Sequence, residues 1–282
     1  MSLEIIQQRL ESYACGSRIE EEQAIREITQ EVVLAALGRT EFFGHAAFHG
    51  GTCLRIFYGM NRFSEDLDFA LREPDGEFSL AEYLAAIAEE LGIYGYDFEI
   101  SDRTRPDRAV QKAFLKDDSL GKVLRLGFRA RTGPMRKIRI KLEVDTNPPE
   151  GSGFEVKYLD FPFVSSMTLH DAPSLFAGKI HALLCRQYIK GRDWYDFIWY
   201  TSAQTEINLT LLSAALDQTG PWQGQHLTVD TDWCKSQLEQ KVRQIDWSAA
   251  ARDVQAFIKP QDQPSLDLWS VDLFTAQIDK IV

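Results

Sequence analysis

The sequence has few cysteines and no hydrophobic segment of membrane-spanning length. Its 282 residues include four cysteines and no CxxC pair; they are Cys15, Cys53, Cys185 and Cys234. Such scattered cysteines argue against a disulfide framework and against a zinc site, and they favour the reducing cytoplasm. No apolar run approaches the roughly 18 residues of a membrane helix. The N-terminal stretch MSLEIIQQRLES is amphipathic with acidic residues early, unlike a signal peptide. We therefore expect a cytoplasmic protein without a membrane partner.

Basic residues are also scarce. The chain has 31 Lys and Arg against 42 Asp and Glu, which gives a formal net charge of −11. This acidity weakly disfavours a protein that coats nucleic acid, because such proteins neutralise phosphates with cations. It does not exclude an enzyme whose acidic residues hold metal ions while a local basic patch binds a polyanion. With 44% hydrophobic and 26% charged residues, the composition is otherwise that of an ordinary globular protein.

The hydrophobic pattern divides the chain into a mixed half and a helical half. Apolar residues recur at helical spacing over residues 18–37, and the helical pattern returns beyond Ser166. Between them lie four strand-like segments separated by Gly, Pro, Asn and Asp: residues 97–100, 122–129, 137–145 and 154–160. We predict an α+β fold with a mixed sheet in residues 1–165 and a helical domain in residues 166–282.

Local signals predict where several helices begin. Ser17 and Ser79 are candidate N-caps, the second for a helix that runs to Leu91. Pro173 suits a first helical turn and precedes a predicted helix over residues 174–189. Gly191 interrupts this pattern, so we expect a further helix to begin near Arg192.

The most informative segment is residues 49–69, which read HGGTCLRIFYGMNRFSEDLDF. Gly50 and Gly51 let the backbone approach a ligand closely, and Thr52 adds a hydroxyl at the start of a helix, where unpaired N–H groups favour a phosphate. Asp66 and Asp68 follow two residues apart, a spacing that in a strand points both carboxylates to one face, about 7 Å apart. Mg²⁺ commonly takes one or two carboxylates together with substrate phosphates. A glycine turn alone is usually only a turn, and an Asp-x-Asp pair is usually a solvated edge. Their succession predicts a metal–nucleotide site.

Two further acidic side chains lie on a later strand-like segment. Residues 137–145, KIRIKLEVD, alternate between an apolar face and a charged face, although any half-buried strand would look the same. Two-metal phosphoryl chemistry needs enough negative charge to hold both ions. Glu143 and Asp145 both lie on the charged face; we favour Glu143 and keep Asp145 as the alternative.

The order of these motifs resembles polymerase-β-type nucleotidyltransferases, and more closely the AbiEii/AbiGii toxin family. The family segments GG[ST]-x-L and R-x-S-x-D-[LI]-D-F match residues 50–54, GGTCL, and residues 62–69, RFSEDLDF. The resemblance implies a nucleotidyltransferase-like mixed sheet, a third metal-binding carboxylate on a later strand, and a helical C-terminal half that completes the active site. It also implies an NTP substrate, Mg²⁺ or Mn²⁺ as cofactor, and nucleotide binding by the Gly50–Thr52 turn and Ser64.

Residues 175–197 are similar to the family's K-x₂-A-x₃-R…[KG]-R-D-x-Y-D ending. Lys179 and Arg186 can share a helix face, and lysine is a compact charge suited to triphosphate oxygens. Asp193 and Asp196 share a face of the next helix. Asp193 could orient Lys179 or take a proton from the acceptor. Alternatively, Lys179 or Arg192 forms only a structural ion pair with Asp193.

The acceptor is left open between several classes. The resemblance implies a bacterial toxin with a cognate antitoxin, a role in phage defence, and tRNA as acceptor. Transfer to an aminoglycoside-like small molecule or to a protein side chain is the enzymatic alternative, and a degenerate nucleotide-binding fold is the non-enzymatic one. Two basic stretches favour RNA: Arg103, Arg105, Arg108 and Lys112, then Arg125, Arg129, Arg131, Arg136, Lys137, Arg139 and Lys141.

Overall fold

The computed structural model describes residues 2–101, 119–128 and 136–282, and it divides into two compact units. The first comprises Met1–Cys53, Phe63–Pro148 and Val156–Leu169, and the second Leu54–Arg62, Pro149–Glu155 and His170–Val282. The chain therefore passes from one unit to the other several times. Of the predicted basic stretches, Arg103, Arg105, Arg108, Lys112, Arg129 and Arg131 lie outside the described residues.

Within the described ranges, seven strands form one mixed sheet in the order β3-β4-β5-β2-β1-β7-β6. Their bounds are β1 Ala46–His49, β2 Asp66–Leu71, β3 Asp97–Ser101, β4 Ser119–Phe128, β5 Arg136–Asp145, β6 Phe154–Leu159 and β7 Ser165–His170. β2 runs parallel to β5 and β1 parallel to β7, whereas the β1–β2, β3–β4 and β4–β5 pairs are antiparallel. The predicted α+β fold with a mixed sheet is confirmed.

Alternation of apolar and charged residues explains why β5 and the first part of β2 form strands. On β5, the apolar side chains Ile138, Ile140, Leu142 and Val144 are all buried. On β2, Leu67 and Phe69 are buried while Asp66 and Asp68 are only half-buried. Side chains of successive strand residues point to opposite faces, so both strands bury one face and present their charged residues on the other.

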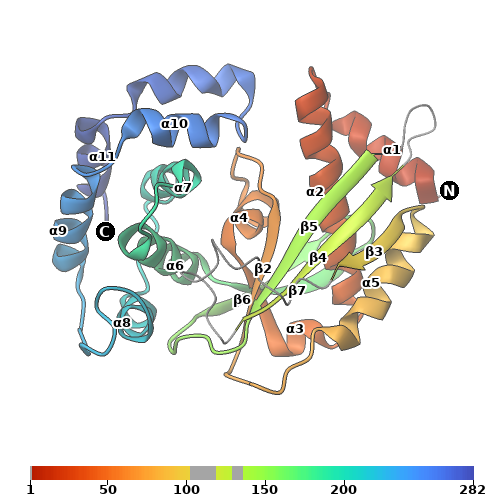
Figure 1. Ribbon diagram of the computed structural model, residues 1–282, viewed down its shortest axis with the longest axis horizontal. Coiled ribbons are helices and arrows are strands. Elements are labelled where there is room, and N and C mark those ends of the chain that lie inside the picture. Colours follow the sequence, from red (N-terminus) through yellow and green to blue (C-terminus); the bar gives the residue numbers. More distant parts are fainter. Residues whose placement is uncertain (1, 102–118, 129–135) are drawn as a thin grey trace. The chain divides into compact units, whose positions relative to one another are not determined.

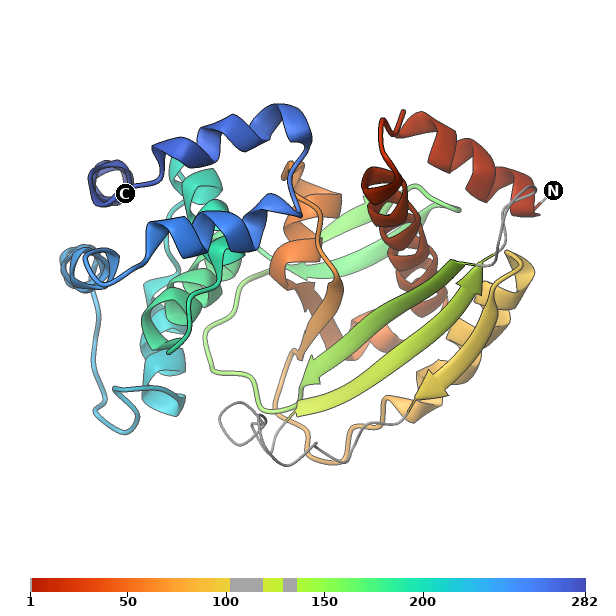
Figure 2. The ribbon, with the colours of Figure 1, turned by 45° about the horizontal axis from the view of Figure 1, so that its top comes forward.

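One face of the sheet is covered by helices α2 and α5 (Figure 2). α2 spans Arg18–Gly38 and starts as predicted, because the Ser17 side chain accepts a hydrogen bond from the Glu20 N–H. α5 spans Ala81–Ile93; its N-cap is Leu80, so the prediction of a Ser79 cap is wrong. The N-terminal helix α1, Ser2–Ser12, and the short α3, Phe42–His45, also belong to this unit.

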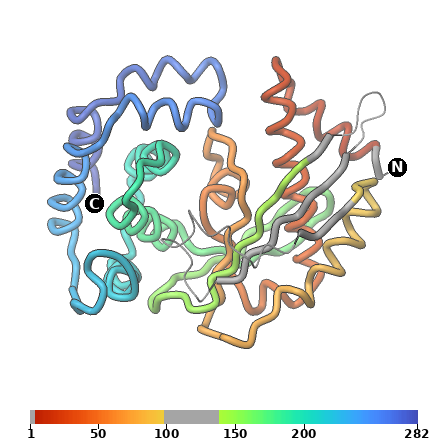
Figure 3. Tube along the Cα trace, in the orientation of Figure 1, coloured from red at the N-terminus to blue at the C-terminus, as the bar shows by residue number. Residues whose placement is uncertain are grey.

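The second unit is helical. Its helices are α6 Ala172–Cys185, α7 Gly191–Ser202, α8 Leu209–Gln218, α9 Thr231–Val242, α10 Trp247–Gln255, the 3₁₀ segment η2 Pro260–Leu268 and α11 Val271–Ile278 (Figures 1 and 3). α6 is shorter than the predicted 174–189 helix. Gly191 begins α7, where a Cβ would stand 1.8 Å from the Ala250 carbonyl oxygen, so only glycine permits this approach to α10. Trp194 packs edge-on against Trp247 and Phe274 in the core.

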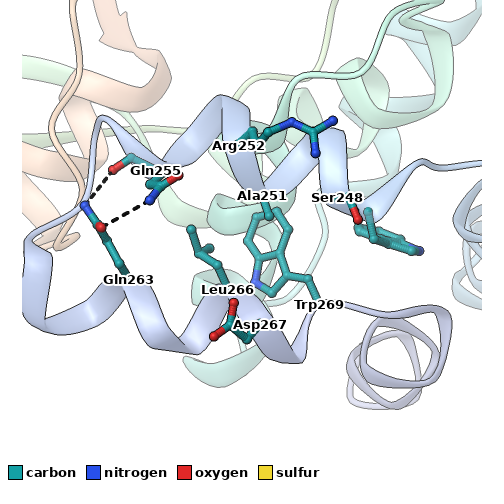
Figure 4. Close-up of a pocket in the computed structure, with 9 residues that line it drawn as sticks. Ser248, Ala251, Arg252, Gln255, Gln263, Leu266, Asp267 and Trp269 are labelled. Carbon is teal, nitrogen blue, oxygen red and sulfur yellow. Dashed lines mark hydrogen bonds between the residues drawn. The ribbon is translucent and has the colours of Figure 1, made fainter.

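A small pocket separates α10 from η2 (Figure 4). Its apolar lining consists of Trp247, Ala251, Leu266 and Trp269. Arg252 and Asp267 are among its polar residues. Gln255 and Gln263 join the two segments at one end, each donating a side-chain amide hydrogen bond of 3.3 Å to the other residue. In the described part of the chain, no helix is long and apolar enough to cross a membrane.

Candidate active site

The glycine turn joins β1 to helix α4, which spans Gly50–Tyr58. Gly50 has a φ of +80°, a conformation that favours glycine. The N–H groups of the first helical turn have no carbonyl partner within their own helix, which makes this end of α4 a candidate phosphate site. Thr52 is fully buried, and its Oγ1 donates a 2.5 Å hydrogen bond to the Asp66 carbonyl oxygen. Thr52 thus fastens the start of α4 to the start of β2.

The two aspartates lie on one face of β2, as the spacing predicts. Asp68 comes directly against the glycine turn: a Cβ on Gly50 would stand 2.5 Å from Asp68 Oδ2. No side chain could occupy that position without displacing the carboxylate. Gly50, the first residue of the glycine pair, therefore lies against a candidate metal ligand. Glycine is required at this position both for its backbone conformation and for the space it leaves.

The parallel register of β2 and β5 places the candidate third ligand. Asp68 lies opposite Glu143, and Asp66 lies opposite Lys141. Asp145 lies two residues further along β5, opposite Ala70. Its carboxylate accepts a hydrogen bond of 3.1 Å from the Asn147 N–H. Glu143 is therefore the strand neighbour of Asp68, whereas Asp145 is not.

The positive charge of Lys141 interacts with the three candidate metal ligands Asp66, Asp68 and Glu143. Burial lowers its pKa, but the hydrogen bond and charge of Glu143, with Asp66 and Asp68 adding, raise it overall. Lys141 and Glu143 form an ion pair on the same face of the sheet. In the described ranges, no three acidic, histidine or cysteine side chains already converge as a metal site. The donor set nevertheless fits a divalent cation, since it consists of hard carboxylate oxygens on one face with the glycine turn beside it.

A second group of charged residues lies within the helical unit. Lys179 on α6 donates to Asp193 at 2.7 Å and contacts Asp196 at 2.8 Å, both on α7. Arg186 also pairs with Asp193. The predicted sharing of one face by Asp193 and Asp196 and the structural ion pair to Lys179 are therefore both present, whereas Arg186 lies just past the end of α6 rather than within it.

This arrangement fixes the ionisation of the group. Burial raises the pKa of Asp193, but Lys179, Arg186 and Lys190 outweigh it and hold the pKa well below its usual range. Burial lowers the pKa of Lys179, and Asp193 and Asp196 raise it above the ordinary value. Asp193 is consequently a carboxylate and Lys179 an ammonium ion at neutral pH.

Sequence reasoning missed one member of this group. Arg62 is buried and donates from Nε to Asp196 Oδ1 at 2.5 Å and from Nη2 to Asp196 Oδ2 at 2.6 Å. The sequence feature that could have identified Arg62 is its position as the first residue of the R-x-S-x-D segment. Ser64, from the same segment, is half-buried, and its carbonyl accepts a 3.3 Å hydrogen bond from Gln30 Nε2.

Two solved structures have a similar fold. MenT4, a nucleotidyltransferase toxin from Mycobacterium tuberculosis, is similar over 95% of this chain and 97% of its own, with a TM-score of 0.54 and 17% identity. JHP933 from Helicobacter pylori is similar over 92% and 89%, with a TM-score of 0.51 and 15% identity. Among curated proteins, none matches the sequence. The fold is therefore that of nucleotidyltransferase toxins.

The family follows from the sequence itself. Residues 32–274 match the model of the nucleotidyl transferase AbiEii toxin family, described as a type IV toxin–antitoxin system. Because the match covers most of the chain, the protein belongs to the AbiEii nucleotidyltransferase toxin family, and the resemblance seen in its motifs is confirmed. The protein is a nucleotidyltransferase.

Proposed function

We propose that this protein transfers NMP from an NTP to an acceptor hydroxyl in a Mg²⁺-dependent reaction. The observation that carries the proposal is the placement of Asp66 and Asp68 on one face of β2, with Glu143 in register beside Asp68 and Gly50 leaving room for the Asp68 carboxylate. In the reaction, the acceptor oxygen bonds to the α-phosphorus, the bond to the β-phosphate oxygen breaks, and pyrophosphate leaves.

Asp66, Asp68 and Glu143 are the proposed metal ligands, with Asp145 as the alternative to Glu143. When bound, Mg²⁺ (or Mn²⁺) would activate the acceptor hydroxyl and neutralise the leaving group. The register of β5 supports Glu143, because that residue is the direct strand neighbour of Asp68. Lys141 now pairs with Glu143 and compensates the negative charge that the metal would otherwise neutralise.

Nucleotide binding is assigned to two groups of residues. Gly50, Gly51, Thr52 and Ser64 form the first, and Lys179 with Arg186 form the second. The backbone N–H groups of the α4 N-terminus suit phosphate oxygens. The Thr52 hydroxyl already donates to the Asp66 carbonyl oxygen, so its contribution is to hold the turn and β2 together.

Asp193 acts by orienting Lys179 rather than by taking a proton. Its carboxylate already engages Lys179 and Arg186, and the surrounding cations keep its pKa low. A general base needs a pKa near the operating pH. We assign the proton of the acceptor hydroxyl to the metal-binding carboxylates instead, among which Glu143 is the strand neighbour of Asp68.

RNA, and specifically the tRNA 3′ end, is the proposed acceptor. Membership in a toxin–antitoxin family supports a cellular target and a cognate antitoxin, with phage defence as the setting and the cytoplasm as the place. The sequence-level support for RNA is the concentration of basic residues near the middle of an acidic chain. A small molecule or a protein side chain is the alternative acceptor.

A labelling experiment tests this proposal. The protein is incubated with each α-labelled NTP, Mg²⁺, and either total bacterial tRNA, a protein extract or an aminoglycoside. We expect label on tRNA from one or two nucleotides, and none after chelation of the metal. Label on protein or aminoglycoside alone would show that tRNA is not the acceptor and that the labelled class is. The absence of transfer to any acceptor would overturn the enzymatic proposal.

A further inference from the structure

Arg62 is the least expected member of the charged group in the helical unit. Its side chain is 3% exposed, and that of its partner Asp196 is 0% exposed. The two are separated by 134 residues in sequence, yet both guanidinium contacts are short and reach both carboxylate oxygens. Such a bidentate pair fixes the orientation of the carboxylate as well as its charge.

The ion pairs form a continuous series from Arg62 to Arg186. Arg62 binds Asp196, Asp196 contacts Lys179, Lys179 binds Asp193, and Asp193 binds Arg186. These are three cations and two carboxylates. Lys179 stands in the middle: it donates a hydrogen bond to Asp193 and lies 2.8 Å from Asp196 Oδ2, so these contacts engage at most two of its three ammonium protons. The third can be donated to a phosphate oxygen.

We propose that Arg62 is a positioning residue for Lys179. By satisfying both oxygens of Asp196, Arg62 neutralises that carboxylate, so Asp196 can orient Lys179 without cancelling its charge toward the triphosphate. Without Arg62, the charge of the buried Asp196 would be compensated by Lys179 alone. The ammonium ion would then bind Asp196 more strongly and the triphosphate more weakly. This inference rests on the proposed function, because it assigns the charge of Lys179 to an NTP.

A purely structural ion pair is the competing explanation. Buried ion pairs contribute little net stability compared with an apolar pair of similar size, but removal of one partner is costly. Loss of activity in a single variant would therefore not separate the two explanations. The separation comes from the double variant, which removes both charges of the pair and leaves Lys179 with Asp193.

The test compares R62M, R62K and the double variant R62M/D196N by steady-state kinetics with the NTP that the wild type uses. We expect R62M to raise KM for the NTP about tenfold with a smaller change in kcat, since a displaced binding group costs affinity before chemistry. R62K keeps the positive charge but loses the bidentate contact, so its KM for the NTP should lie between those of R62M and the wild type. R62M/D196N recovers KM to within about threefold of the wild type, because Lys179 is no longer held by an uncompensated carboxylate.

Arg9 provides the matched control. In the first unit it forms an ion pair with a buried acidic residue, Glu31, which is 3% exposed, while Arg9 itself is 32% exposed. R9M is expected to lower thermal stability without raising KM for the NTP. Circular dichroism and thermal melting are recorded for every variant. If R62M does not fold, KM for the NTP is compared between R62K and the double variant instead.

Each outcome decides between the proposals. An unchanged KM in folded R62M or R62K, or a double variant no better than R62M, overturns the positioning role while leaving nucleotidyl transfer intact. An equal rise in KM for R9M also overturns it. A wild-type protein that transfers no nucleotide overturns the proposed function, and the role of Arg62 falls with it.

Discussion

The carboxylate of Asp68 occupies the space that a side chain on Gly50 would need. The distance from a Cβ on Gly50 to Asp68 Oδ2 would be 2.5 Å, closer than such atoms come in real structures. A residue of the glycine turn and a candidate metal ligand are therefore coupled by packing. This coupling leads to the first prediction.

G50A should abolish most of the transfer activity, by about 100-fold, because the new methyl group displaces the Asp68 carboxylate. Gly59 is the matched control: it has a φ of +73°, and a Cβ there would meet nothing within 4 Å. Both variants should lose about 1–2 kcal/mol of stability through alanine at positive φ. Equal activity losses in G50A and G59A, measured by the labelling assay, would contradict this explanation.

D66N and D68N should each reduce Mg²⁺-dependent transfer by at least about 1000-fold, as expected where metal ligands stabilise the transition state. Both side chains lie on the half-buried face of β2, so the fold should remain intact. D97N, on exposed Asp97 of β3, is the control. Label transfer by D66N or D68N at the wild-type rate would show that the metal site lies elsewhere.

E143Q and D145N distinguish the two candidate third ligands. Because Glu143 is paired with Asp68 across β2 and β5, and Asp145 is paired with Ala70, we expect E143Q to lose about 50-fold in kcat and D145N less than about fivefold. Mg²⁺ titration of the rate gives the second measurement: E143Q should need more Mg²⁺ for half-maximal activity. The opposite order of the two variants would assign the ligand to Asp145.

Glu31 should make stability depend on pH. Burial raises its pKa from 4.5 to about 7, despite the opposing effect of Arg9. In the native state the carboxyl thus keeps a proton that the unfolded chain has lost, so stability falls as pH rises from about 4.5 to 7, by at most about 3 kcal/mol.

The E31Q variant should lack this decline. Urea denaturation at several pH values between 4.5 and 7.5 measures it, with E22Q as the control because Glu22 is more than half exposed. If wild type and E31Q lose stability in parallel over this range, Glu31 is not the titrating group.

Much of the fold could be predicted because its signals are local. The β5 strand was predicted over residues 137–145, within one residue of its observed bounds, Arg136–Asp145, since alternation along a single strand shows which residues are buried. Ser17 was identified as an N-cap because its hydrogen bond reaches only three residues along the chain. By contrast, β7 at Ser165–His170 was missed: its alternation is short, and its pairing with β1 is with a residue far away in sequence.

The sequence by itself determined the family and the class of enzyme, and it predicted the two aspartates of the candidate metal site, because these depend on residue types at short fixed spacings. Only the tertiary structure decided which acid of β5 stands beside Asp68, since parallel register is set by packing between distant segments. It likewise revealed that Thr52 holds β2 through the Asp66 carbonyl, and that Arg62 neutralises Asp196 from 134 residues away. Burial makes such pairings specific, because an uncompensated charge in the interior is too costly to leave alone.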